Sequence, residues 1–155
     1  MSKFTAPNGA AMTSNKQDWE TPQRFFDKLN DRFNFDLDAA ATSENHKLDN
    51  YITPEMNALE CEWDGNVFIN PPYGKQLKYF VKKAFEEYKR DSDRVIVMLI
   101  PARTDTSYWH DYIFENAKIE FLRGRLKFEV NGESKYPAPF PSALVIFGTA
   151  KAAEV

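Results

Sequence analysis

The chain has 155 residues of ordinary globular composition, 43% hydrophobic and 28% charged, with no apolar run long enough to span a membrane and no signal-peptide pattern. A formal net charge of −3 excludes a uniformly basic nucleic-acid-binding protein, so any contact with phosphates must come from a local group of Lys and Arg side chains. One cysteine, Cys61, excludes an internal disulfide, and with only His46 and His110 beside it no metal site is expected.

The N-terminal half predicts a helix, a strand and a long polar segment. Residues 1–18 are polar and are expected to form a flexible arm. Thr21 and Pro22 are typical of a helix start, with Thr21 as the N-cap and Pro22 in the first turn. Alternating apolar and acidic residues over 35–40 predict a strand, and residues 42–65 are expected to form a partly helical excursion. The apolar positions with helical spacing after Pro22 are Phe25, Phe26, Leu29 and Phe33.

The C-terminal half alternates between strand and helix patterns. The short apolar run 67–69 predicts a strand, and 76–90 predicts an amphipathic helix. Six consecutive apolar residues at 95–100, followed by Pro101, indicate a central strand that is buried on both faces. A helix is expected over 105–116. Three more strands are expected at 119–122, 126–130 and 143–147.

Strands that alternate with helices predict a single α/β domain over residues 19–149, with a largely parallel sheet, followed by a tail at 150–155. No helix separates the last strands, so an antiparallel hairpin is expected at one edge of the sheet. Ligands bind such sheets beyond the carboxyl ends of the strands. The segments expected at that rim are Asp38 to Ala40, Asn70 to Tyr73 and Pro101 to Asp105.

The segment of Asn70, Pro71, Pro72 and Tyr73 is the most informative of the three. Its prolines fix φ and lack backbone donors, and the residue before each proline is pushed out of the helical region. The segment is therefore expected to be a stiff, extended ledge. The Asn70 carboxamide and the free carbonyls could accept hydrogen bonds from an exocyclic amine while a planar group stacks on Tyr73. The alternative is an ordinary turn that leaves a strand.

Charge is distributed unevenly along the chain. Acidic residues crowd the segment 18–64, and the basic residues that gather later are Lys75, Lys78, Lys82, Lys83, Arg123, Arg125 and Lys127. These basic groups could bind phosphates, or they could be the solvated faces of surface elements. In the helix expected over 76–90, Glu86 and Glu87 dilute the positive field.

The Asn-Pro-Pro-Tyr sequence resembles the signature of amino-methyltransferases that use S-adenosylmethionine. The chain from about Trp19 to Gly148 resembles the small phage-type DNA N-6-adenine methyltransferases, which are Dam-like. The residues that carry this resemblance are Trp19 to Pro22, Phe35 to Ala41, Asn45, Trp63, Asn70 to Gly74, Leu99 to Asp105, Gly124 to Phe128 and Ser142 to Leu144. The resemblance implies a Rossmann-like class I methyltransferase sheet and an enzyme that acts on DNA in the cytoplasm of a bacterial host, either alone or as a homodimer.

The resemblance also implies direct transfer of a methyl group from S-adenosylmethionine to the N6 amine of a flipped adenine. The Asn70 oxygen and the Pro71 carbonyl would each accept a hydrogen bond from one of the two N–H groups of that amine. Pro72 would keep the ledge rigid, and Tyr73 would stack on one face of the base. No covalent intermediate is needed, so Cys61 has no part in this chemistry.

The resemblance places the methyl donor beside the first strand. The residues that would line its pocket are Trp19, Thr21, Pro22, Asp38, Ala39 and Ala40. Asp38 would accept hydrogen bonds from the donor's amino group or ribose, or it could be a helix cap or a solvent-facing carboxylate. The wider superfamily has a glycine-rich turn after this strand, but residues 10–64 contain no glycine, and the small alanines Ala39 and Ala40 stand in its place.

The resemblance extends to the DNA-binding side. Phe128 could stack on the second face of the base, or it could be a core residue of a hairpin strand. Arg125 and Lys127 could hold phosphates beside it. Arg103 could also hold a phosphate, or it could pair with Asp105.

Two other functions remain open at this point. One is methylation of a protein glutamine or an RNA guanine amine, because Asn-Pro-Pro-Tyr occurs in those enzymes too, although they keep the glycine-rich turn that this chain lacks. The other is a non-catalytic module that binds nucleic acid or protein. Loss of the asparagine or the aromatic residue would favour such a module, and both Asn70 and Tyr73 are present.

Overall fold

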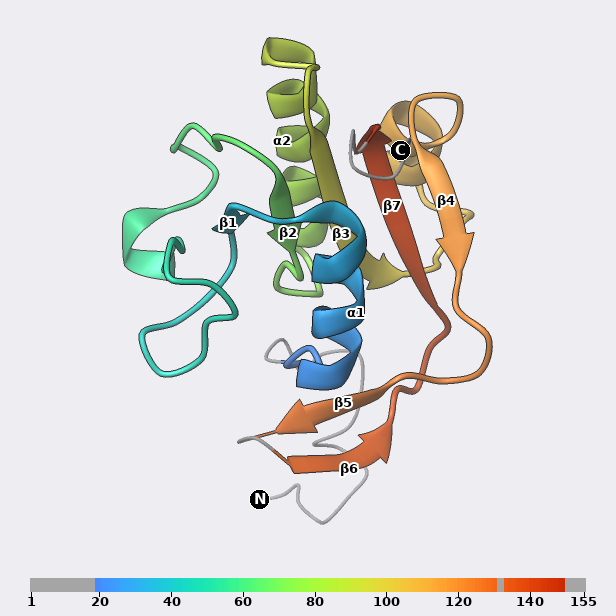
Figure 1. Ribbon diagram of the computed structural model, residues 1–155. Coiled ribbons are helices and arrows are strands. Elements are labelled where there is room, and N and C mark those ends of the chain that lie inside the picture. Colours follow the sequence, from blue (N-terminus) through green and yellow to red (C-terminus); the bar gives the residue numbers. More distant parts are fainter. Residues whose placement is uncertain (1–18, 131–132, 150–155) are drawn as a thin grey trace.

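The computed structural model describes residues 19–130 and 133–149 as an α/β domain (Figure 1). The expected arm at 1–18 and the expected tail at 150–155 lie outside the described residues. The helices and strands are α1 (Gln23–Phe33), β1 (Leu37–Asp38), η2 (Pro54–Met56), β2 (Val67–Ile69), α2 (Leu77–Arg90), β3 (Val95–Pro101), η3 (Trp109–Ile113), β4 (Lys118–Phe121), β5 (Lys127–Val130), β6 (Glu133–Pro137) and β7 (Ser142–Gly148).

Five strands form a mixed sheet in the order β1-β2-β3-β7-β4. The first three strands are parallel, with Leu37 opposite Val67 and Val67 opposite Ile96. Strand β7 runs antiparallel between β3 and β4. The α/β class and the parallel start of the sheet are therefore confirmed.

The prediction of an antiparallel hairpin at an edge of this sheet is wrong. The hairpin exists, but β5 and β6 form a separate two-stranded sheet rather than an edge of the main sheet. The antiparallel strand of the main sheet is β7, which lies inside it. Six of its seven residues are buried, so β7 takes an inner position that covers β3 rather than an exposed edge.

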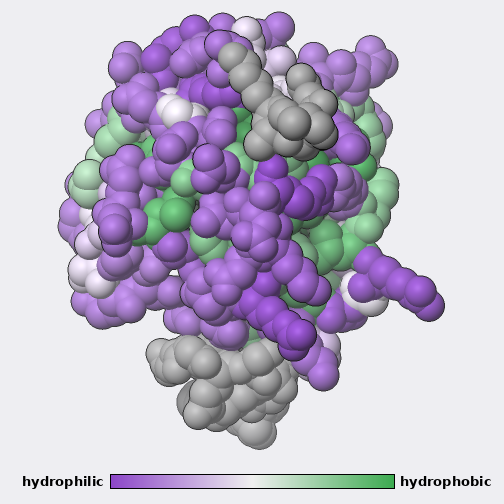
Figure 2. Space-filling model, in the orientation of Figure 1, coloured by the Kyte–Doolittle hydropathy of each residue, from purple (hydrophilic) through white to green (hydrophobic). Residues whose placement is uncertain are grey.

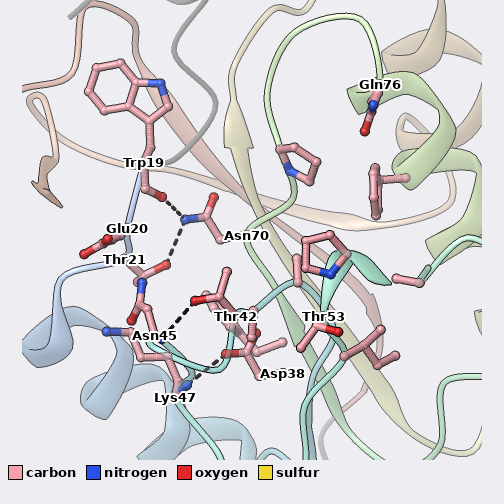
Figure 3. Close-up of a pocket in the computed structure, with 18 of the residues that line it drawn as sticks. Trp19, Glu20, Thr21, Asp38, Thr42, Asn45, Lys47, Thr53, Asn70 and Gln76 are labelled. Carbon is pink, nitrogen blue, oxygen red and sulfur yellow. Dashed lines mark hydrogen bonds between the residues drawn. The ribbon is translucent and has the colours of Figure 1, made fainter. Parts of the chain in front are cut away.

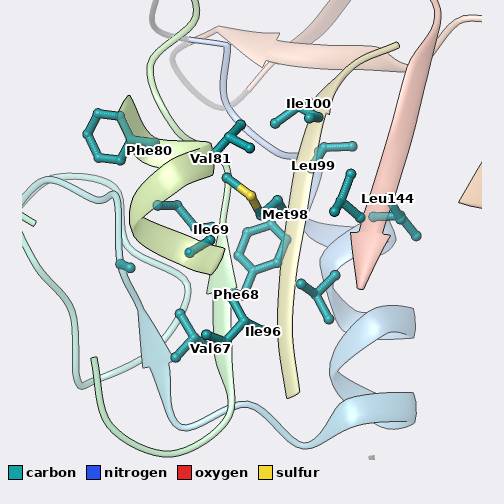
Figure 4. Packing of buried hydrophobic residues seen from close by; sticks show 14 of the residues in the cluster. Val67, Phe68, Ile69, Phe80, Val81, Ile96, Met98, Leu99, Ile100 and Leu144 are labelled. Carbon is teal, nitrogen blue, oxygen red and sulfur yellow. The ribbon is translucent and has the colours of Figure 1, made fainter. Parts of the chain in front are cut away.

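The sheet is covered by α1 on one face and α2 on the other (Figures 1 and 4). All seven residues of β3 are buried, as expected for a central strand. Phe26, Leu29 and Phe33 of α1 are buried as the helical spacing predicts, and Phe26 packs edge-on against Phe68 of β2. The carboxyl ends of the parallel strands point toward the β5–β6 hairpin.

Two local predictions need correction. Helix α1 begins at Gln23 after Pro22, and no side-chain cap bond is present there within the described part of the chain, so Thr21 is not its N-cap. The helix expected over 105–116 is reduced to a short π-helical turn, η3. Its Trp109 and Ile113 are buried.

The face of the molecule in Figure 2 is mainly hydrophilic, with smaller apolar areas between the polar side chains. Among the residues that the structure describes, no helix is both long and apolar enough to cross a membrane.

Candidate active site

A cavity of about 810 Å³ lies where β1 and β2 end, at the edge where the sequence placed a ligand site (Figure 3). Its walls come from residues 19–21 before α1, 38–47 after β1, 52–59 around η2 and 68–80 around the end of β2 and the start of α2. The predicted site residues that line this cavity are Trp19, Thr21, Asp38, Ala40, Asn70 and Pro72. Those that are outside its lining are Pro22, Ala39, Pro71, Tyr73, Arg103, Arg125, Lys127 and Phe128.

The Asn70 carboxamide is held from one side only. Its Nδ2 donates to the Trp19 carbonyl at 2.5 Å and to Thr21 Oγ1 at 3.0 Å (Figure 3). A backbone carbonyl can only accept, so Nδ2 must face Trp19 and Oδ1 must face away. Oδ1 is buried and has no hydrogen-bond partner among the described residues. A buried, unpaired acceptor is costly unless a ligand supplies the donor, so this oxygen is suited to receive an N–H group.

The two prolines after Asn70 differ in exposure. Pro71 is buried, whereas Pro72 is partly exposed and forms part of the cavity wall. The ledge therefore presents Asn70 and Pro72 to the cavity while Pro71 anchors it in the fold.

The structure buries both aromatic residues that were expected to hold a planar group. Tyr73 is 2% exposed, and its hydroxyl donates to the Leu99 carbonyl at 2.9 Å. Phe128 is 1% exposed, and its ring centroid lies 6.3 Å from that of Tyr73 in an edge-on contact. Phe140 and Trp19 complete this aromatic cluster. In this arrangement the two rings touch, so they do not form the open slot for a base that the sequence suggested. Phe128 is instead a core residue of a hairpin strand, which was the other possibility for it.

Asp38 is buried at the end of β1, where only 3% of it is exposed. Its Oδ2 accepts a hydrogen bond from the Lys47 N–H at 2.9 Å. Burial raises the pKa of Asp38 to about 6, although the N–H groups of Lys47 and Ala40 favour the charged form. A carboxylate held in this way is ionised above pH 6 and can accept hydrogen bonds from a ligand in the cavity. The solvent-facing position that the sequence left open for Asp38 is therefore wrong.

Polar residues of the excursion between β1 and β2 form a wall that the sequence did not assign. They are Thr42, Asn45, Lys47, Thr53 and Asn57. Within this wall, the Thr42 hydroxyl accepts from the Asn45 N–H at 2.9 Å. Gln76 and Tyr79 of the α2 region form the opposite rim. Asn45 was among the residues that carry the family resemblance, but the other wall residues had no signal beyond the high polarity of residues 42–65, which does not separate a ligand wall from a solvated loop.

The basic candidates Arg103, Arg125 and Lys127 are exposed. The Arg103 guanidinium lies 5.8 Å from the centroid of the Phe140 ring. Arg125 donates to the Ala138 carbonyl at 3.4 Å. These side chains lie on or near the β5–β6 hairpin and its aromatic cluster rather than inside the cavity.

An α/β sheet with a cavity at the carboxyl ends of its parallel strands, walled in part by Asn70 and Pro72, is typical of a ligand-binding domain of the open-sheet class. A family described as DNA N-6-adenine-methyltransferase (Dam) matches residues 9–152. The chain belongs to this family, which confirms the resemblance seen in the sequence.

Two relatives support this assignment. A DNA N-6-adenine-methyltransferase of Haemophilus phage HP1 is 33% identical over 141 residues, which cover 86% of this chain and 80% of the relative. A DNA N-6-adenine-methyltransferase of Escherichia phage T1 is 33% identical over 117 residues, which cover 74% of this chain and 48% of the relative. The chain thus spans most of the first relative and about half the length of the second.

The raised pKa of Asp38 predicts a pH-dependent cost to stability. The pKa of Asp38 is about 6 in the folded state and 3.8 in the unfolded state. The stabilising contribution of this carboxyl to the free energy of unfolding is therefore fully present below pH 3.8 and is lost as the pH rises through 6. Asp38→Asn should remove that loss and be up to about 2 kcal/mol more stable than the wild type at pH 8. Urea unfolding at pH 4 to 8 measures the difference, with the exposed Asp31→Asn as the control. A constant difference between wild type and Asp38→Asn over this range would contradict the prediction.

Proposed function

We propose that this chain is a DNA adenine-N6 methyltransferase that uses S-adenosylmethionine, on a Rossmann-like methyltransferase sheet. The observation that carries the proposal is the buried, unpaired Oδ1 of Asn70 beside a cavity that also contains the Asp38 carboxylate. An enzyme that transfers a methyl group to an amine must hold the donor and the amine in one space. Family membership and the names of the two phage relatives support the same activity.

The cavity residues fit the methyl donor. Asp38 would accept hydrogen bonds from its hydroxyl or ammonium groups, and Ala40 leaves room for close approach to the backbone. The cavity of about 810 Å³ is also within the usual size of a cofactor site. When bound, S-adenosylmethionine supplies an electrophilic methyl group on its sulfonium. Pro22 and Ala39, which lie outside the lining, stay predicted donor-site residues.

The protein's part in the chemistry is to orient the amine. Asn70 Oδ1 and the Pro71 carbonyl would each accept a hydrogen bond from one of the two N6–H groups of adenine. These two hydrogen bonds favour an N6 whose lone pair is directed out of the ring system. Transfer to N6 would break the bond between the methyl carbon and the donor's sulfur, and N6 would release one proton to solvent. No residue forms a covalent intermediate with the substrate.

Adenine must leave the duplex to reach this ledge, so the proposal includes a flipped base. Arg103, Arg125 and Lys127 would bind phosphates from the exposed surface. Stacking of the base on Tyr73 and Phe128 stays a prediction, and it would require the β5–β6 hairpin to move away from Tyr73. Assembly as a homodimer and action in the cytoplasm of a bacterial host also stay predictions.

The test is methylation of DNA of mixed sequence with S-adenosylmethionine labelled in its methyl group, followed by digestion to nucleosides. The expected product is labelled N6-methyl-2′-deoxyadenosine. Calorimetry should also show that the protein binds the donor. Label in another base, or in protein or RNA substrates but not in DNA, would overturn the proposal. Absence of both binding and transfer would favour a non-catalytic module.

A further inference from the structure

The carboxamide of Asn70 is positioned by a segment far away in the sequence. Its two acceptors, the Trp19 carbonyl and Thr21 Oγ1, lie 51 and 49 residues before it. Both acceptors bind the same nitrogen, so together they fix the plane of the carboxamide as well as its end-to-end orientation. Asn70 itself receives no other hydrogen bond that would hold Oδ1 among the described residues.

The segment 19–21 is itself firmly held. Glu20 and Glu129 of β5 exchange two backbone hydrogen bonds, at 3.1 and 2.9 Å. The Trp19 ring packs edge-on against Phe128, with ring centroids 5.6 Å apart. Thr21 is 3% exposed. A short extended segment that is bonded on one side to the hairpin and on the other to Asn70 has little freedom to move.

The Thr21 hydroxyl has no role in starting α1. The helix begins at Gln23 and shows no side-chain cap bond within the described chain, although threonine is a favoured N-cap residue. Its hydroxyl is instead directed to Asn70 (Figure 3). This contact separates two possible roles for a threonine in the cavity wall: to bind the methyl donor, or to support the residue that receives the amine.

We propose that Thr21 is a positioning residue for methyl transfer, which with the Trp19 carbonyl holds the Asn70 carboxamide so that Oδ1 stays available to the adenine amine. This inference rests on the proposed function and adds a residue to it. Trp19 contributes through its backbone, so a side-chain substitution cannot remove its bond. Thr21 contributes through its hydroxyl, so a substitution at Thr21 removes one of the two hydrogen bonds to Asn70 and leaves the other in place.

The test is Thr21→Val in the full-length enzyme, which replaces the hydroxyl with a methyl group of similar size. With one of its two acceptors lost, the carboxamide can rotate out of place, and kcat should fall about tenfold, the equivalent of one net hydrogen bond. The KM for DNA and the Kd for S-adenosylmethionine should stay within about twofold of wild type. Thr21→Ser keeps the hydroxyl and should restore most of the lost kcat. Thr149→Val makes the same chemical change at an exposed position after β7 and should not alter kcat.

Each result decides between the two roles. An unchanged kcat in Thr21→Val overturns the proposal, as does a weaker donor Kd with normal kcat, which would make Thr21 a donor-binding residue. A Thr21→Ser variant as slow as Thr21→Val also overturns it, because the hydroxyl would not be the cause. If the wild type methylates no DNA, the proposed function fails and this inference fails with it.

A second measurement holds even where Thr21→Val does not fold. In the ¹⁵N-labelled wild type, the Nδ2 protons of Asn70 should exchange slowly with solvent, because both are bonded to acceptors. The exposed Asn116 provides the reference for a carboxamide with only a weak contact, at 3.3 Å. Exchange of the Asn70 protons as fast as those of Asn116 would show that the carboxamide is not held and would overturn the proposal.

Discussion

Replacing Asn70 with alanine should lower kcat for DNA methylation by about 100- to 1,000-fold, the cost of removing one preorganised polar contact from a transition state. Alanine removes Oδ1, which is the side-chain acceptor for the adenine amine. The Pro71 carbonyl would remain as a single acceptor and could not orient the nitrogen alone. Steady-state rates with labelled donor, measured at saturating DNA, give this loss directly.

The fold and the donor site should survive the Asn70 substitution. Asn70 donates to Trp19 and Thr21 from a partly exposed position, so Asn70→Ala should cost no more than about 1 to 2 kcal/mol of stability. The Kd for S-adenosylmethionine should change less than threefold, because Asp38 stays in place. Asn116→Ala, at an exposed position, is the matched control and should keep wild-type kcat. A wild-type rate in Asn70→Ala would remove Asn70 from the chemistry.

Sequence reasoning found the ledge because its signal is local. Two prolines after a buried strand restrict the backbone whatever surrounds them, and the carboxyl ends of parallel strands meet at one edge. Asp38 and Asn70 could therefore be placed at one site before the structure was known. The burial of residues 95–100 in β3 was equally clear, because an unbroken apolar run has few other uses.

The missed features depend on contacts between distant segments. The hydrogen bond from Asn70 to Thr21 joins residues 49 positions apart. The local sequence around Thr21 is that of a helix cap, and nothing in it indicates a contact with Asn70. Tyr73 was expected to be open, but Phe128 of β5 and Phe140, which lies between β6 and β7, pack against it. The inner position of β7 is also decided by pairing with β3 rather than by the sequence of β7 alone.

Replacing Glu87 with alanine should destabilise the fold by about 3 to 5 kcal/mol, the usual cost of breaking a buried charge network by removing one partner. Glu87 is 5% exposed and lies on the inner face of α2. Its Oε1 accepts the Trp63 N–H at 2.8 Å and Arg90 Nη2 at 2.8 Å, and its Oε2 accepts Lys83 Nζ at 3.1 Å. Alanine would leave the buried Trp63 N–H and Lys83 Nζ without this acceptor, whereas Arg90 would keep its ion pair with Asp64. Urea unfolding at pH 7 measures the loss, and an unchanged m-value would show that the unfolded state is the same.

The matched control for this loss is one residue away. Glu86 is exposed on the same helix, so Glu86→Ala should change stability by less than about 0.5 kcal/mol. Equal effects of the two substitutions would mean that the helix, rather than the buried network, sets the cost.

The same network predicts how stability falls in acid. Burial alone would raise the pKa of Glu87, but the bonds from Arg90, the Trp63 N–H and Lys83 lower it from 4.5 to about 2. The folded pKa is below the unfolded one, so the contribution of Glu87 is present above pH 4.5 and is lost as the pH falls toward 2. Glu87→Gln keeps an oxygen for the Trp63 N–H but carries no charge, so its stability deficit relative to wild type should shrink over that range. A deficit that stays constant from pH 5 to pH 2.5 would show that the charge of Glu87 does not stabilise the fold.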